Sequence, residues 1–415
     1  MSIAKRGGTR VSGTCMVAPS KVDSRHVQAA FVAGATTTAI ALHAGVSKRR
    51  IQQLTRHLRP APLPAPDDAT LDAMIAEQRK RLGPNYGFIM MQGALRAANP
   101  GFTYAERRIN DALQRMYPEE HNARKSWAQL KLERGHYHAP HFGYSVHMDF
   151  DCKLQEYGIY IGAIVDGCSR LVCMLNVMTD KLPIDVYFSL WVPYVLRHGF
   201  PDQLITDHGQ EWRLCAFVCH MIRLMGPFAQ RTAHVAVPST RNIRVEKFNF
   251  EVNVRVVIPV RKLLNAMEAS DVMNKRNGVH VGAFSTLIRP LMQVGCDRLM
   301  GAWNEHYVSN ISGRPGTGGR PSLRATKFPH PGGQATFPPG FDGVFEYESE
   351  HGPLRRETQA AHTLDRWYGM QPQQQYRDAA VSHALGGVSA AHVWDEILAE
   401  NYVRFLTAYH VYVQT

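Results

Sequence analysis

The stretch FPDQLITDHGQEW, residues 200–212, places a carboxylate at the end of a short apolar run. Residues 203–206 have the composition of a buried strand, and Asp207 follows them directly. Gly209 then provides a turn into a helical pattern over residues 211–225. Because α/β sheets bind ligands beyond the carboxyl ends of their strands, the position of Asp207 predicts a functional carboxylate.

The sequence before this stretch has the hydrophobic period of strands. Residues 144–151 (YSVHMDFD) alternate apolar and polar side chains, as in a strand covered on one face. Residues 157–166 and 170–179 are largely apolar and are joined by turn-forming residues. Residues 183–199 have a helical pattern that Pro193 should bend. Three antiparallel strands followed by alternating helix and strand predict an α/β core with a mixed sheet.

Two further acidic positions complete a candidate site. Asp149 lies on the polar face of the first strand, so it meets Asp207 at one sheet edge if the first and fourth strands are neighbours. Such carboxylates would repel each other unless a divalent cation lay between them. Within residues 240–257, Glu246 shares one helical stripe with Asn242, Asn249 and Asn253. This pattern predicts a helix along the site, with Glu246 binding metal and the amides touching a polar substrate. A capped helix with a solvated polar face is the structural alternative.

The N-terminal part of the chain predicts helical DNA-binding units. Residues 1–25 form a basic lead without periodicity, which predicts disorder. Residues 26–58 have the spacing of a helix-turn-helix, with Gly45 in the turn and Ser47 as the N-cap of the second helix. That helix exposes side chains able to contact DNA, namely Lys48, Arg49, Arg50 and Gln53. An ordinary helical hairpin with a solvated basic face is the alternative. Residues 59–68 predict a Pro-rich linker and residues 69–135 a second helical unit, for which we expect DNA binding or a connecting role.

Several motifs, in order, resemble one family. VHMD, VDGCSRLV, LITDHGQE, RNIRVEKF and AWNEHY match the integrase core domain of retroviral integrases and of related retrotransposon and transposon enzymes, especially the form found in eukaryotic mobile elements. The resemblance covers residues 136–308 and implies a ribonuclease H-like fold with a five-stranded mixed sheet. It also implies the catalytic, metal-binding triad Asp149, Asp207 and Glu246.

The resemblance further implies a function. Two Mg²⁺ ions, or Mn²⁺ in their place, would support DNA end cleavage by water and strand transfer by the freed 3′-hydroxyl. DNA, as element ends and target, would be the partner, and Lys247 together with the asparagine stripe would contact it. A homo-oligomer and a nuclear location are expected. An inactive, domesticated DNA-binding descendant and a metal-dependent nuclease without strand transfer are the alternatives.

Other metal-ligand patterns are weaker. His136, His138, His141 and His147 precede Cys152 without a pair of cysteines at ligand spacing, so no zinc is expected there. Cys215, Cys219 and His220 have the pattern of buried thiols on an apolar helix. Glu211 is a possible substitute ligand, and Asp166 is expected to shape a turn.

Composition limits the class of protein. The 415 residues allow two or three domains, and 47 Lys and Arg against 35 Asp and Glu give a net charge of +12, which favours a polyanionic partner. Seven cysteines without short spacing predict a reducing, intracellular setting, and no apolar run reaches the roughly 20 residues needed to span a membrane. Residues 309–345 are Gly- and Pro-rich and predict a segment that is mobile or ordered only on DNA. Residues 346–415 should end in a helix that docks on the core or mediates self-association.

Overall fold

The computed structural model describes residues 24–32, 37–58, 63–120, 137–225, 231–308, 318–332, 335–356 and 370–414. The chain divides into two compact units, residues 1–63 and residues 64–415. Most of the predicted basic lead lies outside the described residues. Within the described ranges, even the 28-residue helix α13 has no window apolar enough to cross a bilayer.

The first unit contains three short helices around a small core. They are α1 (Ser24–Val32), α2 (Thr37–His43) and α3 (Lys48–Leu54). The turn before α3 contains Gly45 at a φ of 64°, a conformation that glycine adopts without strain. The hydroxyl of Ser47 accepts from the backbone N–H of Arg50 at 3.3 Å, which confirms the predicted N-cap. Ile51 is fully buried, whereas the predicted DNA-contacting side chains of α3 are exposed.

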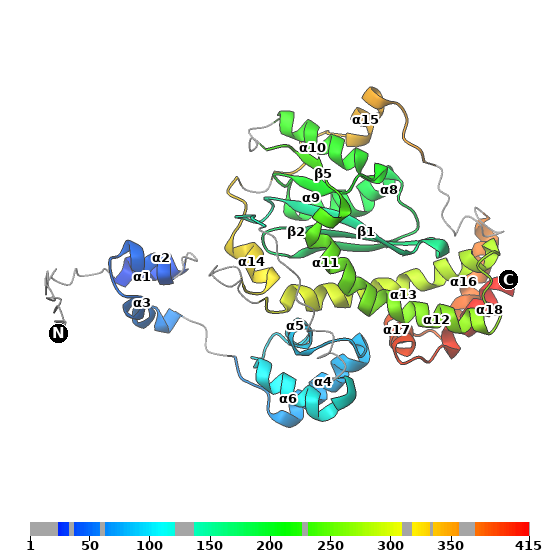
Figure 1. Cartoon of the computed structure of the whole chain (residues 1–415), viewed down its shortest axis with the longest axis horizontal. Coiled ribbons are helices and arrows are strands. Elements are labelled where there is room, and N and C mark those ends of the chain that lie inside the picture. Colours follow the sequence, from blue (N-terminus) through cyan, green and yellow to red (C-terminus); the bar gives the residue numbers. More distant parts are fainter. Residues whose placement is uncertain are drawn as a thin grey trace, which may run out of the picture. The chain divides into compact units, whose positions relative to one another are not determined.

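The second unit is built on a five-stranded mixed sheet (Figure 1). Its strands are β1 (Val146–Leu154), β2 (Ile159–Asp166), β3 (Val172–Met178), β4 (Leu204–Thr206) and β5 (His234–Ala236), in the spatial order β3-β2-β1-β4-β5. The first three strands are antiparallel, and β1 pairs with β4, and β4 with β5, in parallel. The predicted mixed α/β sheet and the neighbouring first and fourth strands are thereby confirmed.

Helices cover both faces of the sheet. One face packs on α8 (Pro183–Val186), η3 (Tyr187–Trp191), α9 (Val192–His198) and α10 (Arg213–Met225). The other packs on α11 (Ile243–Val252), η6 (Asn253–Val257), α12 (Ile258–Ala269) and α13 (Gly278–Glu305). The expectation that β1 is covered on one face only is therefore wrong, because α11 lies over its polar side and buries His147 and Asp151. A π-helical turn, η3, lies just before Pro193, and the predicted bend at the proline stays a prediction.

Further helices extend the core on the α13 side. They are α4 (Asp68–Leu82), α5 (Phe88–Ala98) and α6 (Glu106–Met116) from before the sheet, and α16 (Gln371–Ala384), α17 (Ala390–Leu398) and α18 (Val403–Gln414) from the end of the chain. Their buried side chains share one hydrophobic cluster with α13. The helices of residues 68–116 thus pack into the second unit, and the arginines of α6 form ion pairs with α4, namely Arg108 with Asp68 and Arg115 with Asp72.

Part of the Gly- and Pro-rich region also packs on the core. It contains α14 (Pro321–Lys327), and α15 (Gly343–His351) follows. Val344, Tyr347 and Leu354 join the hydrophobic cluster around α10. The composition of residues 309–345 did not predict this packing, and residues 309–317 lie outside the described ranges.

Candidate active site on the parallel strands

Asp149 and Asp207 lie at matching positions of two neighbouring strands. In the parallel pair, Val146 is opposite Leu204 and His147 is opposite Ile205. Asp149 lies two residues after His147, and Asp207 lies two residues after Ile205. Because neighbouring strands lie roughly 4.8 Å apart, this register brings the two acidic residues side by side at one edge of the sheet.

The loop after β4 holds the Asp207 carboxylate in a defined orientation. Its Oδ1 accepts from the indole Nε1–H of Trp212 at 2.5 Å and from the backbone N–H of Gly209 at 3.0 Å. Gly209 is required here for space, because a Cβ at this position would lie 2.4 Å from Oε2 of Glu211 and 3.0 Å from Oδ1 of Asp207. The DHG sequence is therefore a turn that fixes one carboxylate oxygen.

Helix α11 brings Glu246 across β1, and its asparagines attach it there. Nδ2 of Asn249 donates to Oδ2 of Asp149 at 3.0 Å, and Nδ2 of Asn253 donates to Oδ2 of Asp151 at 2.5 Å. Asn242 is fully buried, with Nδ2 donating to the carbonyl oxygen of Met148 at 2.9 Å and Oδ1 lying 2.7 Å from Nδ1 of His147. The asparagine stripe thus aligns α11 on the strand that carries Asp149.

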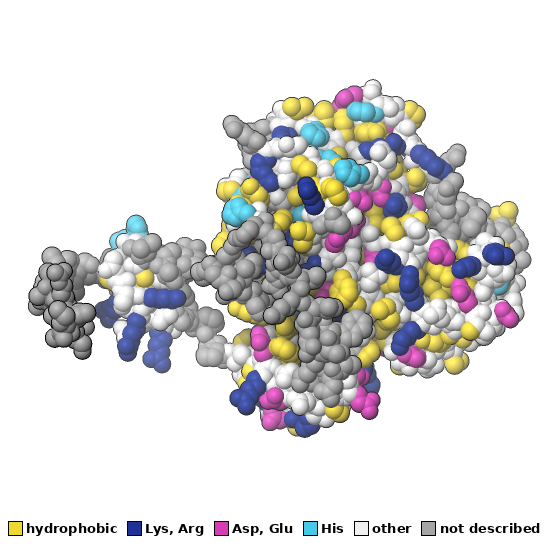
Figure 2. All heavy atoms as spheres, in the orientation of Figure 1, with side chains coloured by type: hydrophobic (Ala, Val, Ile, Leu, Met, Phe, Trp, Pro, Cys, Tyr) yellow, Lys and Arg dark blue, Asp and Glu magenta, His cyan; other side chains and the backbone are white. Residues whose placement is uncertain are grey.

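These contacts bear on the predicted DNA-binding residues. Both ends of the Asn242 amide are bonded inside the protein, so direct contact with DNA would require these bonds to break. Asn249 and Asn253 are partly exposed, and Lys247 is exposed, so DNA contact by these three side chains stays a prediction. Lys48, Arg49, Arg50 and Gln53 are exposed on α3 of the other unit, where Figure 2 shows a gathering of Lys and Arg side chains.

The electrostatics show that Asp207 and Glu246 lie close enough to Asp149 to affect its carboxylate. Burial raises the pKa of Asp149 from 3.8 to about 7; the Phe150 backbone N–H opposes this shift, and the charges of Asp207, Glu246 and Asp151 add to it. Burial also raises the pKa of Glu246. A carboxylate that is both desolvated and repelled by like charges is stabilised by a cation.

The donor set fits a hard divalent cation. The acids and asparagines described above offer carboxylate and amide oxygens, which is the ligand type that Mg²⁺ prefers. Oδ1 of Asn249 is buried and has no hydrogen-bond partner in the described part of the chain, so it is available to a ligand or to ligand-bound water. The three carboxylates do not all lie within 4.8 Å of one another. The structure therefore does not hold the three carboxylates at the spacing of ligands to a single ion.

Other predicted residues have structural roles. Glu211 pairs with Lys181 at 2.8 Å, so its carboxylate is engaged beside the site. Asp166 is fully buried and accepts from the backbone N–H groups of Gly143 and Ser169 at 2.8 and 2.6 Å, which confirms its predicted turn role. Cys215 and Cys219 are buried free thiols, as predicted.

Sequence patterns missed three residues near the site. Trp212 appeared in the sequence only as part of a helical pattern. Asp151 and Phe150, which stacks on Trp212, appeared only as parts of a strand. Phe150 and Trp212 stack at 5.0 Å between ring centroids and thereby hold the indole against Asp207. The alternation of β1 marked Asp151 as polar but gave no sign that it would be buried beside Asp149.

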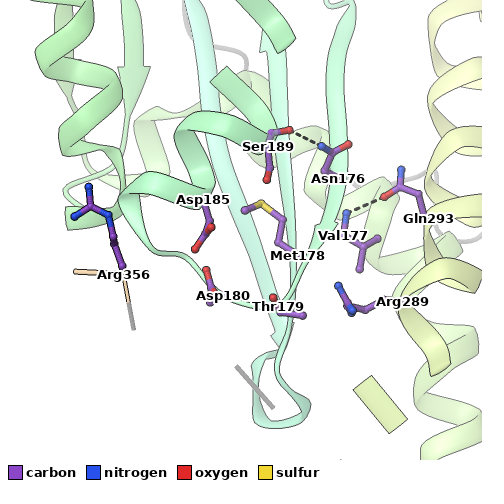
Figure 3. A pocket seen from close by; sticks show the side chains of 10 residues that line it. All are labelled: Asn176, Val177, Met178, Thr179, Asp180, Asp185, Ser189, Arg289, Gln293 and Arg356. Carbon is purple, nitrogen blue, oxygen red and sulfur yellow. Dashed lines mark hydrogen bonds between the residues drawn. The ribbon is translucent and has the colours of Figure 1, made fainter. Parts of the chain in front are cut away.

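Two hollows flank the sheet. One, of about 570 Å³, opens beside Asp207 and is lined by His208, His234, Tyr347 and His351 among others. The second, of about 500 Å³, lies beyond the end of β3 (Figure 3). There the carboxylates of Asp180 and Asp185 approach each other, and burial together with the hydrogen bond to Asp180 raises the pKa of Asp185 to about 6. None of the three predicted acids lines this second hollow.

Comparison with known proteins identifies the central region. No curated protein matches the chain. A family model described as "Integrase core domain" matches residues 136–315, which include β1 to β5, α11 and α13. The match begins where the sequence resemblance began and contains all three predicted acids. Residues 136–315 therefore match the integrase core domain family, and their five-stranded mixed sheet is consistent with the ribonuclease H-like fold of such domains.

Proposed function

We propose that the protein is a DNA integrase or transposase of a mobile element, which cleaves DNA ends and joins them to target DNA by polynucleotidyl transfer. The observation that carries the proposal is Asp149, a half-buried carboxylate whose pKa is raised to about 7 by burial and, in addition, by the charges of Asp207 and Glu246. Its place at the parallel strand ends of an integrase core domain supports the same function.

Asp149, Asp207 and Glu246 would hold two Mg²⁺ ions, with Asp149 shared between them and Mn²⁺ as a substitute. When bound, the ions would supply activation of the attacking oxygen and charge neutralisation at the phosphate of an in-line displacement. The nucleophile is water for cleavage and a DNA 3′-hydroxyl for joining, so no covalent protein intermediate is needed.

The chain's own residues pre-orient this site. Asn249 holds one oxygen of Asp149, and Trp212 and Gly209 hold one oxygen of Asp207, which leaves the other Asp207 oxygen for the cation. Fixed ligands require little reorganisation when the phosphate arrives, which is the main protein contribution in such chemistry.

DNA contact is assigned to two regions. Lys48, Arg49, Arg50 and Gln53 form an exposed basic face on α3, suited to phosphates and base edges. Lys247, Asn249 and Asn253 lie on α11 beside the acids and would contact the reacting end. Two sites acting on two DNA ends require at least a dimer, and we place the protein in the nucleus, where its substrate lies.

Two alternatives make different predictions with the same assay. A domesticated, inactive descendant would bind DNA without cutting it, and a nuclease would cut without joining. The assay incubates the purified full chain with Mg²⁺ and labelled duplexes carrying the terminal sequences of its own element. Cleaved and joined products are expected, and both should vanish in Glu246→Gln while DNA affinity stays within about twofold.

The control variant is Glu251→Gln, on the same helix but paired with Arg255. It should retain activity. Cleavage without joined product would favour the nuclease, binding without cleavage would favour the inactive descendant, and full activity of Glu246→Gln would refute the triad.

A further inference from the structure

A second group of metal-ligand type lies at the opposite end of the same parallel strands. His141 precedes β1, Asp202 precedes β4, and His330 follows α14. One nitrogen or oxygen from each of the three residues lies within 4.8 Å of the others. The side chain of Asp202 is 7% exposed, and the side chains of His141 and His330 are each 17% exposed. The sequence predicted no zinc in this region because no pair of cysteines accompanies the neighbouring histidines at ligand spacing, and His330 lies far along the chain from them.

The separations suit tetrahedral coordination. Nε2 of His141 lies 3.4 Å from Oδ2 of Asp202, and Nε2 of His330 lies 2.9 Å from Oδ1. Bonds of about 2.0–2.1 Å from zinc to nitrogen or oxygen place tetrahedral ligand atoms roughly 3.3–3.4 Å apart. Each nitrogen is therefore within about 0.5 Å of that separation from one oxygen of Asp202, and the two nitrogens face different oxygens of the carboxylate.

The protons of His141 give a second, independent observation. Its Nδ1 lies 3.0 Å from the carbonyl oxygen of Phe142, and its Nε2 faces the Asp202 carboxylate. Both partners are acceptors, but a neutral imidazole has only one N–H. A ring with an N–H on both nitrogens satisfies the two acceptors, and so does a neutral ring that donates from Nδ1 while its Nε2 binds a cation shared with the carboxylate. A ring held by a backbone carbonyl while its other nitrogen faces outward is the usual arrangement of a metal-binding histidine.

His330 requires one rearrangement. In the structure its Nδ1 accepts from the backbone N–H of Gly332 at 3.1 Å, so its single proton lies on Nε2 and is donated to Asp202. Metal binding moves that proton to Nδ1 and frees Nε2. Gly332 is exposed, so water can accept its N–H instead.

We propose that His141, Asp202 and His330 bind a Zn²⁺ ion that is separate from the Mg²⁺ site. Two imidazoles and one carboxylate favour zinc over Mg²⁺, which prefers oxygen ligands alone. Water completes the coordination. The ion ties the segment after α14 to the core, where the backbone N–H of Phe142 already donates to the carbonyl oxygen of Phe328 at 2.7 Å.

The test uses the full-length chain stripped with a chelator and titrated with Zn²⁺, and with Co²⁺ as a spectroscopic substitute. We expect uptake of about one Zn²⁺ per chain, visible absorption bands of four-coordinate Co²⁺ and a higher melting temperature with zinc. His330→Gln and Asp202→Asn should each lower zinc affinity roughly 100-fold.

Two variants serve as controls. His138→Ala removes an exposed histidine three residues from His141, and Asp149→Asn removes a carboxylate of the Mg²⁺ site; both should keep zinc binding. Absence of zinc uptake and of cobalt bands in the wild-type chain would overturn the proposal, whatever the stability of the variants. Equal loss in His138→Ala, or unchanged affinity in both His330→Gln and Asp202→Asn, would also overturn it. Mg²⁺-dependent cleavage is a separate measurement, so failure here leaves the proposed function untouched.

Discussion

The two ends of the parallel pair β1 and β4 carry different ligand chemistry. Asp207 directly follows β4 and Asp149 lies beside it within β1, whereas His141 and Asp202 precede the amino ends of these strands and are joined by His330. Asp202 and Asp207 are five residues apart, a span of about 16 Å in extended chain. The same two strands therefore present a hard-cation site at one end and a nitrogen-containing site at the other, too far apart to share an ion.

The difference also concerns charge. Beside β4, burial and, in addition, the charges of neighbouring acids raise the pKa of Asp149. At the amino ends, one buried carboxylate meets two imidazoles, and Arg223 donates to the backbone carbonyl oxygen of the same residue, Asp202. In the two proposals, the first group binds cations for catalysis and the second holds chain segments together.

The largest expected effect is on DNA cleavage, which should depend on Asp207 and its neighbours and should be independent of zinc binding at the amino ends of the strands. Asp207→Asn should lower DNA cleavage at least about 10³-fold, because several kcal/mol of transition-state stabilisation depend on this ligand. Its zinc content should not change. Rates from single-turnover cleavage and metal analysis of the same sample check this prediction. Loss of zinc in Asp207→Asn would show that the two ends are coupled.

The next effect concerns the turn that positions Asp207. In Gly209→Ala, the added Cβ would lie 2.4 Å from Glu211 and 3.0 Å from Asp207, so the carboxylates must move. We expect a loss of roughly 10- to 100-fold in cleavage, because small displacements of a catalytic group have effects of this size. Circular dichroism should show an intact fold. As a comparison, Gly101→Ala meets no atom within 4 Å and should be neutral in the same assays.

A smaller effect is expected on the free energy of unfolding, measured in the absence of divalent cations. The pKa of Asp149 is raised in the folded state from 3.8 to about 7, so the folded protein holds a proton that the unfolded chain releases. Stability of the wild type should then fall as pH rises from about 4 to about 7. Asp149→Asn has no such titration, so its free energy of unfolding at pH 8 should exceed that of the wild type by about 2–3 kcal/mol. This value is smaller than the full effect of the pKa shift because Asp149 is partly exposed to solvent.

The stability difference should become small below about pH 3, where the wild-type carboxyl is mostly protonated in both states. It should also shrink when Mg²⁺ is added to the wild type. Urea unfolding at several pH values measures it. A wild type that gains stability between pH 4 and pH 7 relative to Asp149→Asn would contradict the assigned burial and repulsion.

The smallest effect concerns the first unit. Replacing Arg49 and Arg50 by Ala should reduce the slope of log affinity against log salt by about 1–2, since each lost phosphate contact releases about 0.9 fewer counterions. Gln52→Ala removes no charge from the same helix and should leave the slope unchanged. Binding titrations from low to moderate salt measure the slopes. Equal slopes for the arginine variant and the wild type would exclude α3 as a phosphate-binding surface.

Local patterns predicted much of the fold because they depend on near neighbours in sequence. The alternation over residues 144–151, the turn after Asp166 and the Ser47 cap all correspond to observed features. The same local rules failed where tertiary contacts decide. They left β1 open on one face, although α11 covers it, and they predicted mobility for a segment that includes α14.

By itself, the sequence determined which residue types stand at strand ends and which stripe α11 presents, because hydrophobic period and turn chemistry are local properties. It thereby named Asp149, Asp207 and Glu246. Only the tertiary structure decided that Asn242 would be buried against β1, that Trp212 would hold Asp207, and that His330 would reach Asp202. These contacts join residues whose proximity depends on how whole elements pack, and no spacing along one chain encodes that packing.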